Sequence, residues 1–305
     1  MRDADVVPFL RAIHDRPGDD LPRLVFADFL EEHGDWRGPL MRRPAPTSPL
    51  RDREATDAWH SHLGNLHGVQ WVSCRRGLLS VLMPAAAVYE LPDSHLLKKA
   101  FRQGWVEHLD LIDNAGIPWA DQLDLQELPR LGFQSVDDET LEHLPPLPAL
   151  RELYLNNCRA TRAELEWLND FPRLNFVHAS RYQSLGDPVT DGDVSRFQSI
   201  RKLRSLRLVG AFSNTALELV SGMRGLRRLE IDGSHITNLG LSLLARLEEL
   251  EALCLGRGEL TDQALHFLVS LPRLRRLDFL YDGFWLSEHA LASFRAARPD
   301  ILVSR

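Results

Sequence analysis

Residues 226–250 read LRRLEIDGSHITNLGLSLLARLEEL, and residues 251–274 continue as EALCLGRGELTDQALHFLVSLPRL. The second stretch nearly repeats the first, with Leu or Ile at the same offsets and an IT or LT pair near the middle. The opening LxxLxL alternates as a β-strand does, so its fourth and sixth residues are predicted to point into a core and their neighbours outward. The later segment TDQALHFLVSL has apolar residues at helical spacing, which predicts a helix behind the strand.

The same frame extends over about two thirds of the 305-residue chain. Lines of the repeat follow one another at steps of 22 to 29 residues and open at Val106, Leu128, Leu150, Leu174, Leu203, Leu226, Leu250 and Leu274, with a stub at Ile301. One line cannot bury its own apolar faces, whereas stacked lines share a continuous core. The repeats therefore predict an α/β solenoid over residues 106–305, with a parallel sheet on its concave face and helices on its convex face.

The phrasing LTDxxLxxLxxLPxL resembles the ribonuclease-inhibitor-like class of leucine-rich repeats. That class usually places a buried Asn or Cys at the ninth position, where the side chain satisfies backbone groups of the turn. Asn114 and Cys158 match this pattern, and Ser234 can substitute with its hydroxyl, whereas Ala211 and Gly258 depart from it. The resemblance implies a helix-backed solenoid whose ladder of turn side chains is incomplete.

A different kind of sequence precedes the repeats. Residues 9–35, FLRAIHDRPGDDLPRLVFADFLEEHGD, predict two short helices separated by Pro17 and Gly18, the second opening at Asp20 and ending at Gly34. This stretch resembles the repeat-companion domain of certain bacterial repeat proteins, whose usual form is close to FLxAIxxxPxDDxPRLVxADWLEExGDxRG; Phe29 replaces the usual Trp. That family has no established activity, so the resemblance implies a bacterial context and no mechanism.

The second helix is apolar on nearly every side, so we expect it to be buried against the first helix and a further element. On this interpretation Asp28 shares a buried face with three apolar residues, namely Leu21, Leu24 and Val25. An unpaired buried carboxylate is costly, so Asp28 is expected to pair with Arg23 or with a nearby helix end.

The predicted organisation has four parts. A helical hairpin occupies residues 1–38, and a proline-rich linker occupies residues 39–53. Residues 54–105 are predicted to form an N-terminal cap with a helix in EATDAWHSHL, two strands in VQWVSCRRGLLSVLM and an outer helix in DSHLLKKAF. The repeats fill residues 106–305.

Composition narrows the classes of function. The formal net charge is -7 and no basic stripe is visible, which disfavours a nucleic-acid partner. The three cysteines are too few for a disulfide framework and favour a reducing compartment. The most apolar stretch, GLLSVLMPAAAVYEL, is short and broken by Pro84, so no membrane association is expected. We expect a soluble, cytoplasmic protein.

The sequence contains no GxGxxG, P-loop, HExxH, GxSxG or CxxC motif, so we predict no enzyme, no catalytic residue and no cofactor. His60, His62 and His67 lie close together, but an HxH pair on a helix diverges, so no metal site is predicted. Cys254 and His178 both face outward. They lie three strands apart, about 14 Å, which is too far for a nucleophile and its base.

Candidate binding residues come from the outward positions of the strands. Four of them are predicted to be neighbours across adjacent strands: Tyr154, Phe176, His178 and Arg207. Aromatic and Arg side chains dominate the energetics of interfaces, and Arg228 and Glu230 extend the patch. The alternative is that the aromatic rings only pack against one another. The segment SRYQSLGDPVTDGD (180–193) is predicted to form a loop at the rim beside the patch.

Three hypotheses follow. The first is a non-enzymatic scaffold that holds a protein or peptide partner on the concave face. The second is an adaptor or regulatory subunit that docks through the N-terminal hairpin. The third is an enzyme with an unrecognised site.

Overall fold

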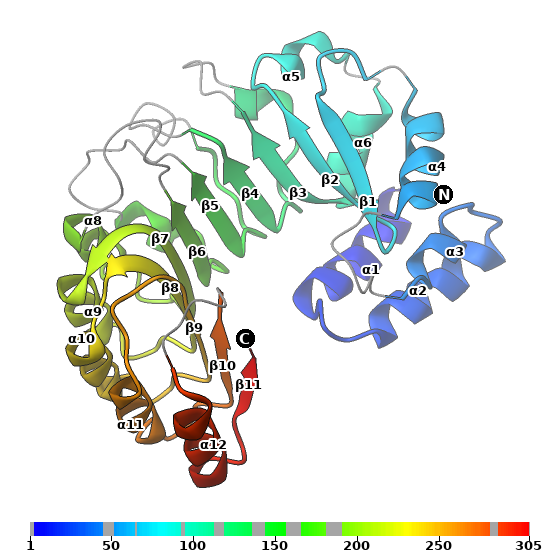
Figure 1. Cartoon of the computed structure of the whole chain (residues 1–305). Coiled ribbons are helices and arrows are strands. Elements are labelled where there is room, and N and C mark those ends of the chain that lie inside the picture. Colours follow the sequence, from blue (N-terminus) through cyan, green and yellow to red (C-terminus); the bar gives the residue numbers. More distant parts are fainter. Residues whose placement is uncertain are drawn as a thin grey trace. The chain divides into compact units, whose positions relative to one another are not determined.

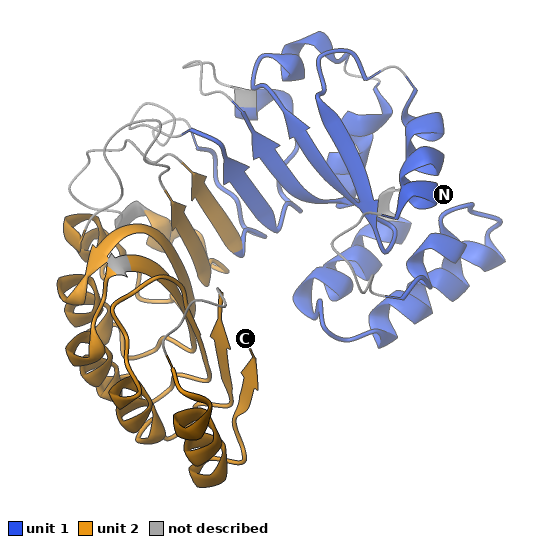
Figure 2. Cartoon of the chain, viewed as in Figure 1, with its two compact units in different colours: residues 1–151 blue, residues 152–305 orange. Residues whose placement is uncertain are grey.

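The computed structural model divides the chain into two compact units, residues 1–151 and residues 152–305 (Figure 2). It describes residues 3–44, 52–64, 66–92, 95–112, 119–135, 144–156, 166–180, 191–280 and 286–304. Asn114 and Cys158 of the predicted turn ladder lie outside the described residues, as do residues 181–190 of the predicted rim loop and the side chain of Ser234.

Unit 1 contains the N-terminal helices and the first strands (Figure 1). Its elements are α1 (Asp3–Asp15), α2 (Leu21–Glu32), α3 (Gly38–Met41), α4 (Arg53–Leu63), β1 (Trp71–Arg75), β2 (Leu78–Met83), α5 (Ala87–Glu90), α6 (Leu96–Gln103), β3 (Val106–Leu111), the 3-10 helix η1 (Trp119–Gln122) and β4 (Arg130–Phe133). Strands β1 and β2 form an antiparallel hairpin, and β3 and β4 continue the sheet in parallel. The predicted pair of N-terminal helices, the helix in 54–63 and the hairpin are thus present.

Helix α2 buries a different face from the one predicted. The residues it buries recur at helical spacing and are Arg23, Phe26, Ala27 and Leu30. The exposed fractions of Leu21, Leu24 and Val25 are 63%, 41% and 47%. The expectation of a buried Asp28 paired with Arg23 is wrong, since the exposed Asp28 pairs with Arg42. A segment that is apolar all round does not reveal which side meets its neighbours.

The buried face of α2 enters an aromatic cluster. The Phe26 ring lies 5.0 Å from the Phe9 ring of α1 and 5.4 Å from the ring of Trp105, between centroids. Trp105 precedes β3 and is fully buried, and the Arg37 guanidinium lies 4.1 Å from the centroid of its ring. These contacts attach the N-terminal helices to the sheet of unit 1.

Unit 2 repeats a strand, a turn and a helix. Its elements are β5 (Glu152–Asn156), η2 (Glu166–Asp170), β6 (Phe176–Ser180), α8 (Asp191–Phe197), β7 (Ser205–Ser213), α9 (Asn214–Ser221), β8 (Arg228–His235), α10 (Asn238–Leu243), η4 (Leu244–Arg246), β9 (Ala252–Leu255), α11 (Gln263–Val269), β10 (Arg276–Phe279), α12 (Glu288–Ala297) and β11 (Leu302–Ser304). Its strands lie in sequence order and pair in parallel, and the helices cover the outer side of the curved sheet (Figure 1). Among the described residues, no helix is both long enough and apolar enough to cross a membrane.

The strands alternate as predicted. In every line from 203 onward the first, fourth and sixth residues are buried: Leu203, Leu206, Leu208, Leu226, Leu229, Ile231, Leu250, Leu253, Leu255, Leu274, Leu277 and Phe279. The helices supply the other wall of this core; Leu265 and Leu268 of α11 are examples. The strand order, the repeat frame and the shared core show a leucine-rich-repeat solenoid, with the N-terminal helices before it.

Polar side chains also join successive repeats, at the N-termini of the helices. A Ser or Thr stands at the start of each of these helices, and the next residue in the sequence is an Asp or Asn. The side chain of that Asp or Asn hydrogen-bonds the corresponding Ser or Thr of the following repeat. Asn214 accepts from the Thr237 backbone N–H and donates to the Thr237 hydroxyl, both at 2.9 Å. The same arrangement joins Asp191 to Ser213, Asn238 to Thr261 and Asp262 to Ser287. We call this series the helix-start ladder.

The substitution Asn214→Ala tests the ladder. It removes both bonds to Thr237 and leaves a partly buried N–H without its acceptor, so the free energy of unfolding should fall by about 1–3 kcal/mol. Asn214→Asp should retain most of the stability, because Asp191 and Asp262 accept from both the backbone N–H and the hydroxyl of the Ser in the repeat that follows each of them. The measurement is urea unfolding followed by circular dichroism. Asn175→Ala, which removes one long 3.3 Å bond, is the control; equal losses at 214 and 175 would contradict the ladder.

Candidate partner-binding face

The face of the unit 2 sheet opposite the helices is called the open face here. Strand register arranges its side chains in two rows of directly opposed residues. The tyrosine row is Tyr154, His178, Arg207, Glu230, Cys254 and Asp278. The phenylalanine row is Glu152, Phe176, Ser205, Arg228, Ala252 and Arg276. The six predicted binding residues all fall in these rows, and the predicted neighbours are adjacent.

Aromatic side chains occupy the end of the rows on β5 and β6. The Tyr154 ring lies 5.3 Å from Phe176 and 5.7 Å from His178, between ring centroids, and it meets His178 edge to face. The Tyr154 hydroxyl donates to Glu152 Oε2 at 2.7 Å. The rings therefore do pack against one another, as the alternative interpretation supposed. All of them are only half-buried and so still present surface to a second molecule.

His178 is held neutral. Burial lowers its pKa to about 4, and the positive charge of Arg207 on the next strand acts in the same direction. Its Nε2 is buried without a hydrogen-bond partner among the described residues. At neutral pH this imidazole therefore contributes an uncharged, weakly polar surface between Tyr154 and Arg207.

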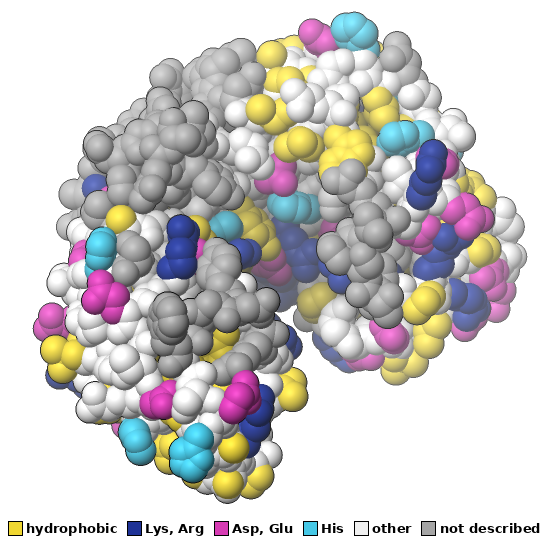
Figure 3. Space-filling view, viewed as in Figure 1, with side chains coloured by type: hydrophobic (Ala, Val, Ile, Leu, Met, Phe, Trp, Pro, Cys, Tyr) yellow, Lys and Arg dark blue, Asp and Glu magenta, His cyan; other side chains and the backbone are white. Residues whose placement is uncertain are grey.

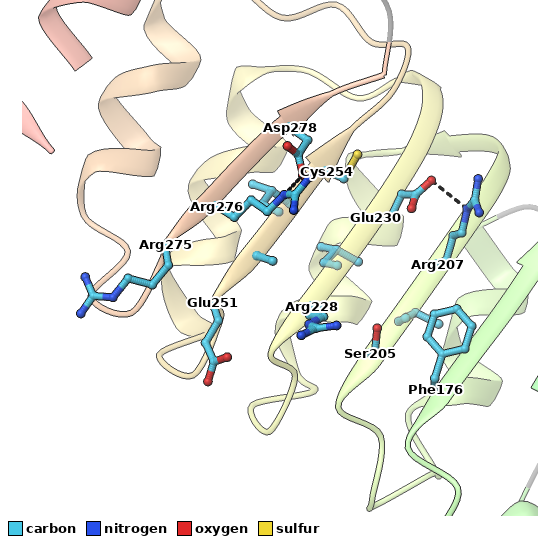
Figure 4. Close-up of a pocket in the computed structure, with 14 residues that line it drawn as sticks. Phe176, Ser205, Arg207, Arg228, Glu230, Glu251, Cys254, Arg275, Arg276 and Asp278 are labelled. Carbon is cyan, nitrogen blue, oxygen red and sulfur yellow. Dashed lines mark hydrogen bonds and ion pairs between the residues drawn. The ribbon is translucent and has the colours of Figure 1, made fainter. Parts of the chain in front are cut away.

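Arg207 and Glu230 form an ion pair across β7 and β8. Arg207 Nε lies 2.7 Å from Glu230 Oε1 (Figure 4). Neither atom makes a well-directed hydrogen bond within the described residues, so the contact is mainly one of charge with charge. Burial raises the pKa of Glu230, and the Arg207 charge opposes that rise. The pair is half-buried, so the cost of removing both charges from water offsets much of their attraction.

A hollow of about 430 Å³ opens over β6 to β10 beside this pair. Charges of both signs line it: Arg207, Arg228, Arg275, Arg276, Glu230, Glu251 and Asp278 (Figure 4). Arg276 Nε donates to Asp278 Oδ2 at 2.6 Å. Arg228 differs from the other arginines, because it is exposed and makes no ion pair with any described residue. The hollow therefore presents one uncommitted guanidinium, together with the Phe176 ring and charges that each have an opposite partner.

Cys254 also lines the hollow, in the tyrosine row. Burial raises the pKa of its thiol to about 12, and the carboxylates of Glu230 and Asp278 act in the same direction. The sulfur is therefore a thiol at neutral pH, and a thiol is a poor nucleophile.

The hollow is not centred on the predicted patch. The aromatic cluster lies at one edge of the hollow, and the hollow extends to Arg276 and Asp278 on β10. Alternation placed these two residues on the open face. It carried no information about where that face is hollowed, which depends on the size of the side chains in neighbouring rows.

The histidines near residue 60 do not converge. His60 Nε2 bonds the Val72 carbonyl at 3.1 Å, His62 lies against the Trp36 ring, and His67 pairs with Glu90. In the part of the chain that the structure describes, no group of three His, Cys, Asp or Glu side chains could hold a metal ion.

No protein-family model matches the chain. It is similar in structure to the internalin InlF of Listeria monocytogenes, with 17% identity, a TM-score of 0.40, and coverage of 68% of this chain and 69% of that one. Internalin C2 of the same organism has 22% identity and a TM-score of 0.38, with coverage of 55% of this chain and 65% of that one, so this chain spans slightly less than two thirds of that protein. Human 5T4 has 17% identity and a TM-score of 0.47, with coverage of 74% of this chain and 84% of that one. Each likeness is weak, and none bears on what this chain binds.

The charge of Arg207 should be visible in the titration of His178. Arg207→Gln removes a positive charge that opposes protonation, so the pKa of His178 should rise above about 4. It should stay below its ordinary value of 6.5, because burial, the larger cause, remains. The measurement is an NMR titration of the imidazole signals, assigned with His178→Gln. Arg228→Gln, on the same face but in the other row, is the control and should leave this pKa unchanged; an equal rise in both variants would contradict the assignment.

Proposed function

We propose that the chain is a non-enzymatic binding protein and that the open face of unit 2 holds a segment of a protein or peptide partner. The observation that carries the proposal is the hollow, which is lined by the uncommitted Arg228 together with Phe176 and the ion pairs Arg207–Glu230 and Arg276–Asp278. Its volume of about 430 Å³ suits a few side chains of an extended segment, since small-molecule and peptide pockets occupy roughly 300–1,000 Å³.

The chemistry of the lining describes the partner. Arg228 can bind a carboxylate with two parallel N–H donors, and its planar group also stacks on aromatic rings. Phe176 offers apolar surface in the same hollow, and the Tyr154 ring extends that surface beyond it. Arg207 pairs with Glu230 and Arg276 with Asp278 inside the hollow. Glu251 and Arg275 pair with Arg227 and Asp300, which do not line it, so all these charges together add little net charge. The partner segment should therefore carry an acidic side chain beside an aromatic or aliphatic one.

The states of the reactive groups support binding rather than catalysis. Cys254 is a protonated thiol, and His178 is a neutral imidazole whose buried Nε2 has no hydrogen-bond partner among the described residues. They lie on β9 and β6, about 14 Å apart at about 4.8 Å per strand, too far for proton transfer between them. An enzyme would need convergent groups elsewhere.

Arg228→Ala tests the proposal. The full-length chain is used to capture proteins from an extract of the cells that make it, and each captured protein is purified and titrated against the chain by calorimetry. Since Arg228 makes no ion pair with described residues, its loss should leave the melting temperature unchanged. The affinity for the partner should fall by about tenfold or more, as is usual for a central interface arginine.

The matched control is Arg246→Ala, an exposed arginine of η4 on the helix side of the same unit. Its affinity for the partner should equal that of the unaltered chain. If Arg228→Ala binds as tightly as Arg246→Ala, the partner does not occupy the open face.

A second candidate function is that of an adaptor that docks through the N-terminal hairpin. The exposed Leu21, Leu24 and Val25 favour it, because they form an apolar strip at spacings of three and four residues on α2. Figure 3 shows hydrophobic side chains among charged ones on this helical part of unit 1. On this proposal the strip binds one protein and the open face another.

The double substitution Leu21→Gln with Val25→Gln tests the adaptor. Both residues are largely exposed, so stability should change by less than about 0.5 kcal/mol. One protein should then be missing from the set that the chain captures. The proteins whose capture is weakened by Arg228→Ala should still be present. Leu239→Gln, which alters a 68% exposed leucine of α10, is the control. A capture profile identical to that of the control would rule out docking through α2.

A further inference from the structure

A small cavity in unit 1 is lined mainly by arginines. It lies where the start of α2, the turn between β1 and β2, and strands β3 and β4 meet, and its volume is about 90 Å³. Its lining residues are Pro17, Arg23, Arg75, Arg76, Glu107 and Arg130. The six come from widely separated parts of the sequence, and no sequence motif unites them.

Arg23 is the buried member of the group. It is only 5% exposed, and its Nη1 donates to the Arg76 carbonyl at 2.8 Å. Its Nε is buried and has no hydrogen-bond partner among the described residues. Burial, followed by the nearby charge of Arg76, lowers the pKa of Arg23 to about 10. A buried guanidinium donor without an acceptor is costly, so an acceptor that enters the cavity would stabilise it.

The lining has an excess of positive charge. Glu107 is its one carboxylate, and it lies 3.5 Å from Arg130 Nη1. Arg76 reaches the Asp20 carboxylate and the Arg43 carbonyl, neither of which lines the cavity. Arg75 is exposed at the mouth. Four guanidinium groups around one carboxylate are an arrangement that an anion offsets, and arginine binds oxyanions in a bidentate manner.

We propose that this cavity is a binding site for a single phosphoryl group. A cavity of about 90 Å³ has room for one tetrahedral oxyanion. A dianion balances the excess charge of the lining better than a monovalent carboxylate does. The group is either free phosphate or the phosphate of a phosphorylated side chain. This site lies in unit 1 and does not depend on the function proposed for the open face.

Calorimetric titration of the full-length chain tests the site, with inorganic phosphate and O-phosphoserine as separate probes. Ionic strength is kept constant with chloride, because screening alone changes surface electrostatics. Saturable binding is expected for at least one probe. Tighter binding of phosphate assigns the site to the free ion, and tighter binding of O-phosphoserine assigns it to a phosphorylated side chain. Acetate, a carboxylate of similar size, should bind at least about tenfold more weakly.

The variants connect the binding to the cavity. Arg75→Gln removes an exposed lining arginine and should weaken binding of the better probe by about tenfold or more. Arg23→Lys keeps the charge but removes Nε, and should weaken binding as well; if that buried variant does not fold, Arg75→Gln decides. Arg53→Gln, which alters a 94% exposed arginine of α4, is the control and should bind as the unaltered chain does. The site is overturned by no saturable binding up to about 10 mM probe. Acetate binding as tightly as phosphate, or unchanged affinity in Arg75→Gln, also overturns it.

Discussion

No repeat of this chain can bury its own leucines, and this constraint determines the rest of unit 2. Each line offers an apolar edge on both sides, and only the next line in register covers it. The helix-start ladder imposes the same register with directed bonds, since Asn214 meets Thr237 only when the two helices begin side by side. Hydrophobic burial thus supplies most of the free energy, and the polar ladder specifies the alignment.

The same register creates the open face. In each line the fourth and sixth residues are buried in the core. The third and fifth residues therefore point outward and lie directly opposite their counterparts on the neighbouring strands. Arg207 and Glu230 meet for this reason, and so do His178 and Arg207. Burial, reinforced by the Arg207 charge, lowers the pKa of His178 and leaves the imidazole uncharged. Arg228 lies between Ser205 and Ala252 and is left without a carboxylate partner in the described chain. The stacking of the repeats thus determines the positions on the open face, and the sequence determines which side chains occupy them.

The sequence predicted what depends on short periodicities. Alternation identified the strands, the solenoid and the side of the sheet on which Tyr154 and Arg228 lie. It could not identify the buried side of α2, because nearly every position of that helix is apolar. Nor could it reveal the arginine cavity, which Arg23 and Arg130 line together although they lie far apart in the sequence. The helix-start ladder had a visible signal, a Ser or Thr followed by Asp or Asn in successive lines, but its bonds join different repeats.

The helix-start ladder has a consequence for how such an array evolves. Every joint uses interchangeable chemistry, an Asp or Asn on one side and a Ser or Thr on the other. If one whole line is duplicated or deleted, the two ends that come together still match, as Asn214 would match Thr261 after loss of the line between them. The array can therefore change length by unequal recombination without a mismatched seam, while the outward residues of each line are free to diverge.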